Sequence, residues 1–166
     1  MKTIFAVLLL LAFASTSYAS DGDQTVRWQS IKGVITAPGI DNPVAGISAG
    51  TLPWTTQDGR ASVNLATGAA SFEVTWLVLN GGPSGTTGPV QQVTGTLVCN
   101  PGARNQAVLD TPAVSLSQQG NAYFNGNIGT VPAPCDNPLF LIRIANLGAA
   151  SGRWIATGAV RSFKRD

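Results

Sequence analysis

The fold class predicted by the sequence is all-β: an antiparallel β-sandwich of about nine to ten short strands, with a small antiparallel β-barrel as the alternative. The 19 glycines and 10 prolines are scattered through the chain after residue 19, and both residue types are unfavourable inside helices. Beyond that point no stretch keeps a helical apolar period, whereas alternation of apolar and polar side chains recurs. Turn-forming residues separate these stretches roughly every 8–12 residues, which is the spacing of a sandwich.

The N-terminus predicts a cleaved secretory signal over residues 1–19. Lys2 gives a positive start, residues 4–14 are apolar, and small residues flank Tyr18 before the expected cleavage site. The apolar stretch is shorter than the about 20 residues that a membrane-spanning helix needs. We therefore expect an exported protein without a membrane span, extracellular or, in a Gram-negative source, periplasmic.

The mature protein is expected to contain a single domain. Residues 20–30 are predicted to form a loose N-terminal segment, and residues 31–166 one β-sandwich domain. A chain of this length can bury one sizeable hydrophobic core and is short for two.

Alternation identifies the individual strands. The strongest covers residues 70–79, where Phe72, Val74 and Trp76 share a face that we expect to be buried. From Leu77 onward this segment is apolar on both faces, which is typical of a central, covered strand. Further strands are expected at residues 33–36, 44–48, 60–65, 90–99, 107–109, 113–117, 122–128, 139–145 and 153–163.

The connections follow from glycine, proline and asparagine. Residues 80–89 are rich in glycine, serine and threonine, and we interpret them as a loop between strands. No lysine follows in the order of a phosphate-binding loop, so that function is not indicated. Residues 118–121 are expected to form a hairpin connection.

The two cysteines, Cys99 and Cys135, are expected to form one disulfide. An even, minimal pair in an exported protein is typical of a structural bridge. Cys99 ends a predicted strand and Cys135 lies in the connection at residues 132–138, so the bridge would hold that loop against the sheet. No metal site is expected from these thiols, because the chain has no histidine to complete a zinc tetrahedron.

The charge balance excludes some classes of partner. Ten lysines and arginines face eight acidic residues, for a net charge of +2. Such a balance gives no long-range field to gather nucleic acid or an anionic membrane. We expect no nucleic-acid partner.

The absence of histidine also limits catalysis. It removes Ser-His-Asp and Cys-His chemistry, and no other nucleophile–base pair is visible. Paired carboxylates, as in glycosidases, remain as the enzymatic alternative. However, Glu73 alternates with apolar residues on a predicted solvated face, and the aspartates sit in turn-like sequences. Asp21 and Asp23 resemble the opening of a calcium loop but lack its later ligands. We expect neither a metal nor a cofactor, and the balance favours a non-enzyme.

Three of the four tryptophans have an expected structural role. Trp76 and Trp154 alternate with apolar residues and are predicted to point into the core. Trp28 lies near the mature N-terminus and could clamp an edge of the sandwich.

The fourth, Trp54, is the first candidate for ligand contact. It precedes a polar turn that contains Asp58 and Arg60, so an indole plate and hydrogen-bonding groups lie close in sequence. The candidate ligand site is therefore Trp54, Asp58 and Arg60. The alternative is that Trp54 plugs one end of the sandwich.

The function expected from these observations is that of a secreted, non-catalytic binding or structural protein. Its partner would be a saccharide or a surface protein, and the oligomeric state is left open. The alternatives are a small extracellular hydrolase that uses paired carboxylates, and a subunit of a surface assembly joined through strand edges.

Overall fold

The computed structural model describes residues 24–37, 39–80 and 85–163. The predicted signal peptide and the motif at Asp21 and Asp23 lie outside the described residues. Within them the chain is almost entirely β-structure with antiparallel pairing, which confirms the predicted fold class. The one helical element described, the 3-10 turn η1 (Gly148–Ala150), has three residues. In this part of the chain no helix has the length and apolar character needed to cross a membrane.

Nine strands form one large sheet in the order β7–β6–β10–β11–β1–β3–β4–β9, with β8 paired beside β6. Their bounds are β1 Thr25–Gly33, β3 Asp58–Asn64, β4 Ala69–Thr75, β6 Gln92–Cys99, β7 Ala107–Asp110, β8 Val114–Ser115, β9 Ala122–Asn127, β10 Leu139–Ile144 and β11 Trp154–Phe163. A second, two-stranded sheet pairs β2 (Trp54–Thr55) with β5 (Val78–Leu79).

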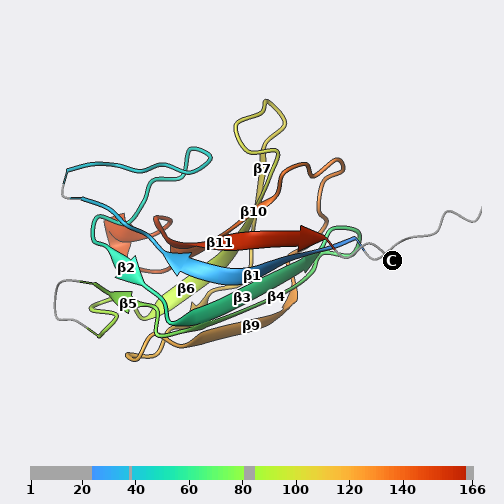
Figure 1. Cartoon of the computed structure of the whole chain (residues 1–166). Coiled ribbons are helices and arrows are strands. Elements are labelled where there is room, and N and C mark those ends of the chain that lie inside the picture. Colours follow the sequence, from blue (N-terminus) through green and yellow to red (C-terminus); the bar gives the residue numbers. More distant parts are fainter. Residues whose placement is uncertain (1–23, 38, 81–84, 164–166) are drawn as a thin grey trace, which may run out of the picture.

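The large sheet is curled into a half-barrel whose two arms face each other across the core (Figure 1). Gly95 of β6 lies against the opposite arm, since a side-chain carbon there would approach Phe72 of β4 within 2.7 Å. It would also come within 2.8 Å of Phe140 on the neighbouring strand β10. The ring of Phe72 packs against two others. Its centroid lies 5.9 Å from that of Phe140 and 6.0 Å from that of Phe124 of β9. Close packing of these rings over a glycine sets the separation of the arms.

Alternation along β3 and β4 gives the sheet an apolar inner face and a polar outer face. Ala61 and Val63 of β3, with Phe72 and Val74 of β4, are buried. The residues between them, such as Ser62 and Glu73, point away from the core. A solvated outer face of this kind is where a binding surface can be built without disturbing the core.

Cys99 and Cys135 form the expected disulfide, which joins the end of β6 to the connection between β9 and β10. The side chain of Asn100 adds two bonds to the same connection: its Nδ2 donates to Pro134 O (2.9 Å), and its Oδ1 accepts from Asp136 N (2.7 Å). A disulfide-bonded pair is compatible with an extracellular location.

Two predictions about the N-terminal part were wrong. Residues 25–30, expected to be loose, form the first part of β1, which pairs with β11 on one side and β3 on the other. Trp28 is therefore in a central strand and buried, with its ring centroid 5.4 Å from that of Phe140. The sequence before residue 31 does alternate, and its partners, 33 residues or more further on, supply the pairing that makes it a strand.

Two short strands expected early in the chain are also absent. β1 ends at Gly33, so residues 34–36 continue outside it, and residues 44–48 form a turn closed by a Val44–Ile47 bridge. Trp154, in contrast, is buried as predicted.

Candidate functional site

The outer face of β1, β3, β4 and β9 carries a shallow groove of 450 Å³. Its floor is a row of directly opposed residues, Arg27, Ser62, Ser71 and Asn125, one from each of the four strands. The hydroxyls of Ser62 and Ser71 lie 2.9 Å apart and hydrogen-bond each other. Because these two central side chains are small, the face is hollow between longer neighbours.

The next row along the strands forms one wall of the groove. Arg60 lies opposite Glu73, which lies opposite Tyr123 of β9. Arg60 Nη2 donates to Glu73 Oε2 at 2.7 Å; the Arg60 side chain is mostly exposed and that of Glu73 is partly exposed. Tyr123 is 61% exposed, a large fraction for an aromatic side chain in a strand. The groove thus combines hydroxyl, amide and guanidinium groups with an exposed ring.

A second exposed aromatic side chain, Trp76, follows directly on β4, and its prediction as a core residue was wrong. Trp76 is 45% exposed, and Leu77 takes its place in the core. The cause is a backbone φ of +57° at Trp76, which interrupts the alternation between β4 and β5. Residues other than glycine rarely adopt this region, and such strain is concentrated at functional sites.

The hairpin that leads into β9 holds Trp76 in this conformation. Trp76 N donates to Asn121 Oδ1 (3.2 Å), and Leu77 N donates to Gly120 O (2.9 Å). Gly120 has a φ of +79° and packs so closely that any side chain there would overlap the backbone of Leu77. The exposed position of Trp76 is therefore built by two hydrogen bonds and a required glycine.

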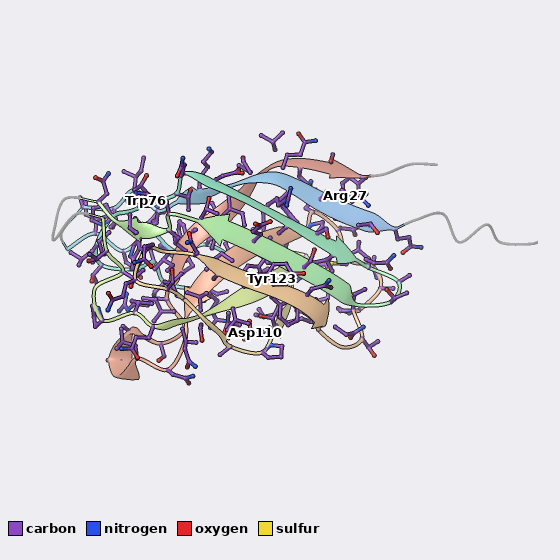
Figure 2. The ribbon with its side chains drawn as sticks, turned by 90° about the horizontal axis from the view of Figure 1, so that it is seen from below. Arg27, Trp76, Asp110 and Tyr123 are labelled. Atoms are coloured by element: carbon purple, nitrogen blue, oxygen red, sulfur yellow. A yellow bond between two sulfur atoms is a disulfide. The ribbon has the colours of Figure 1, made fainter. Side chains whose placement is uncertain are left out.

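Trp76 is linked through Asn121 to the strand that carries Tyr123. Asn121, which binds the amide of Trp76, is two residues from Tyr123 on the same chain segment, about 7 Å at the rise of a strand. Figure 2 shows Trp76 beyond the end of β4, Tyr123 over β9, and Arg27 on β1. The candidate site is the groove together with these two rings, and we call it the aromatic groove.

The three residues of the predicted ligand site lie in two different places. Asp58 and Arg60 lie together, beside Glu73 and Thr75, around a hollow of 60 Å³. Trp54 is 4% exposed and lines a separate apolar cleft. The structure brings Arg60 into the aromatic groove, and the binding role of all three residues stays a prediction.

The carboxylates of the described residues mostly bind neighbouring protein groups. Asp110 accepts from Arg143 Nη1 and from Thr96 Oγ1, and Asp41 accepts from Ser48 Oγ. Asp58 Oδ1 accepts from the amide of Gly59. Across residues 24–37, 39–80 and 85–163, no three acidic or cysteine side chains are gathered as metal ligands.

The sequence did not single out Trp76 and Tyr123 as candidate binding residues. Tyr123 alternates with Ala122 and Phe124, so its outward position was readable from the pattern. The only sequence feature that pointed to the outward position of Trp76 is that the residues after Thr75 are apolar on both faces of the predicted strand. Either a bulge or a covered central strand explains this pattern.

Comparisons with known proteins identify no relative. No protein-family model, no curated protein and no solved structure matches this chain.

Proposed function

We propose that this protein is a secreted, non-catalytic binding protein that holds saccharide chains in the aromatic groove. The observation that carries the proposal is the exposed ring of Tyr123 in the lining of a polar groove, with a second exposed ring, Trp76, beyond the end of β4 (Figure 2). Sugar rings have apolar faces that stack on aromatic side chains, and hydroxyl rims that hydrogen-bond to polar ones.

The polar groups of the groove suit a neutral ligand. The ion pair of Arg60 and Glu73 largely cancels its own charge, and beside the single cation of Arg27 the floor offers the hydroxyls of Ser62 and Ser71 and the amide of Asn125. Hydroxyls and amides both donate and accept, as the hydroxyls of a sugar do. A shallow groove on the outer face of a sheet accommodates a chain of rings rather than a single enclosed one.

The test is retention of the protein on insoluble polysaccharides such as cellulose, chitin, xylan and β-glucan. We expect retention on at least one of them, and a loss of affinity of about tenfold or more in Trp76→Ala and in Tyr123→Ala. Val108→Ala, which removes an exposed apolar side chain from β7 in the other arm, is the matched control and should bind as the wild type does. Equal retention of all four proteins, or none on any polysaccharide, would contradict the proposal.

A second candidate function, a hydrolase, has one observation in its favour. Asp58 and Glu73 lie diagonally across β3 and β4 and line the same small hollow. Diagonal neighbours are about 7–8 Å apart, which is within the range used by glycosidases. The hollow of 60 Å³ is small for a substrate, and both carboxylates already bind protein groups.

The hydrolase is tested by the release of reducing sugar from the same polysaccharides. Activity that Asp58→Asn and Glu73→Gln each abolish would establish it. No release by the wild type, together with retention, would leave the binding function alone.

A further inference from the structure

A second cleft, of 350 Å³, is lined by residues of β2, β5 and η1. These elements lie at the same end of the half-barrel (Figure 1). Most of its lining is apolar: Leu52, Trp54, Leu79, Pro89, Val90, Ile144, Leu147, Ala149 and Ala150. It shares no lining residue with the aromatic groove. Its volume is in the range of small-molecule sites, which often occupy the mouths of β-barrels.

The floor of this cleft is the end of the hydrophobic core. Trp54, Val90 and Ile144 line it and belong to the buried core cluster. Leu52, at the rim, is 54% exposed. An apolar ligand in the cleft would therefore touch core side chains directly and cover an exposed leucine, and both contacts remove apolar surface from water.

The only charge in the described lining of the cleft is positive. Arg153 is the one charged side chain among the described lining residues, and no carboxylate is among them. Its Nη1 donates to Ala49 O at 2.8 Å, which fixes the guanidinium and uses one of its five N–H groups. Asp41 lies on the other side, where it and Arg153 line a neighbouring hollow together with Gly50 and Thr51. Within the apolar cleft no carboxylate of the described residues lines the site beside the arginine, although its charge also acts on Asp41 in the neighbouring hollow.

We propose that the cleft binds a small amphiphile with an apolar hydrocarbon or aromatic body and one carboxylate, whose oxygens lie against Arg153. The apolar body would occupy the space between Trp54 and Leu147. A guanidinium with free edges at the border of an apolar site is the group best suited to bind a carboxylate in two-point contact. This site is independent of the proposed saccharide binding, because it lies on a different part of the surface.

The test uses three probes of equal chain length: octanoate, octanol and octyltrimethylammonium. Each is titrated into ¹⁵N-labelled protein, and the amide and tryptophan indole signals are followed by NMR. We expect saturable shifts for octanoate centred on Trp54, Leu147 and Ala150, with an affinity about tenfold higher than that for octanol. The cationic probe should bind more weakly than octanol.

Two variants test whether the probes bind in the cleft beside Arg153, and a third serves as a control. Arg153→Gln should lower the affinity for octanoate to that for octanol, whereas Arg104→Gln, which removes an exposed arginine from the loop before β7, should not. Ala149→Phe fills the cleft from an exposed position and should weaken all three probes. Equal affinity for octanoate and octanol in the wild type would overturn the proposal, as would the absence of saturable shifts or their centring on Tyr123. The probe series requires no variant, so a misfolded Arg153→Gln would not block the test.

Discussion

The backbone amide of Trp76 donates a 3.2 Å hydrogen bond to the side-chain Oδ1 of Asn121. This bond ties an exposed indole at the end of β4 to the hairpin that begins β9, 45 residues further along the chain. Because the two strands are neighbours in the sheet, the bond fixes the backbone of Trp76 beside the start of the strand that carries Tyr123. Two predictions follow from this arrangement, and two more from the disulfide and from Asp41 elsewhere in the fold.

The left-handed backbone at Trp76 predicts an inverted order of stability for its variants. At an ordinary strand position glycine is less stable than alanine by roughly 0.5–1 kcal/mol. With a φ of +57°, Trp76→Gly should be more stable than Trp76→Ala by about 1 kcal/mol, because alanine keeps the strain and glycine removes it. Urea unfolding of the two variants measures the difference. Alanine as the more stable of the two would show that residue 76 is not left-handed.

The close contact of Gly120 with Leu77 predicts a large cost for any side chain at residue 120. Gly120→Ala should lower the free energy of unfolding by about 2–4 kcal/mol, since it adds a steric overlap to an unfavourable φ. Gly102→Ala is the matched control: its φ of +77° is nearly the same, and its Cβ would have no neighbour within 4 Å. The control should cost about 1 kcal/mol. Equal costs at the two sites would mean that the hairpin does not pack on Leu77 as described.

The disulfide between Cys99 and Cys135 should contribute substantially to stability. It links residues 36 apart, for which the chain-entropy model gives about 4 kcal/mol as an upper figure. We expect Cys99→Ala/Cys135→Ala to lose about 2–4 kcal/mol in urea unfolding while the far-ultraviolet circular dichroism remains that of a β-protein. Stability that is unchanged in the double variant would contradict this role.

The loop before β2 should be sensitive to acid through Asp41. The hydrogen bond from Ser48 is the main cause that lowers the pKa of Asp41 below 3.8, helped by the amide of Ala49 and the charge of Arg153 and opposed by desolvation. A folded pKa below the unfolded value means that ionised Asp41 favours folding. This contribution is complete above pH 3.8 and is lost as the pH falls through the folded pKa.

The carboxyl carbon of Asp41, followed by NMR between pH 2 and 6, measures this pKa. Ser48→Ala should raise it toward 3.8, and Ser115→Ala, a serine of β8 far along the chain, should leave it unchanged. A Ser48→Ala variant with the wild-type midpoint would exclude the proposed hydrogen bond in solution.

Much of the fold could be predicted from the sequence, because it depends on local pattern. Alternation in β3 and β4 fixes which side chains are buried, and the cysteine pair predicts the bridge. The strand order could not be predicted: β9 pairs with β4, and β11 with β1, and such long-range partners leave no mark in either strand alone. The same holds for the curl that turns the predicted layers into two arms of one sheet.

The orientation of only one of the two exposed aromatic side chains of the candidate site could be predicted from the sequence. Tyr123 was readable as an outward residue from its neighbours, whereas Trp76 was not. Its orientation depends on Gly120 and Asn121, which meet Leu77 and Trp76 only after β9 has docked beside β4. Trp54 was singled out for its polar neighbours in sequence, yet its side chain faces the apolar cleft, away from the groove that contains Arg60.

The aromatic groove is tested most directly by an NMR titration of the labelled wild-type protein with soluble oligosaccharides cut from cellulose, chitin, xylan and β-glucan. For at least one of them, we predict saturable shifts centred on the Trp76 indole, Tyr123 and Asn125, with the cleft at Trp54 and Leu147 unperturbed. Shifts centred outside the groove, or no saturable shift with any of the four, would contradict the account.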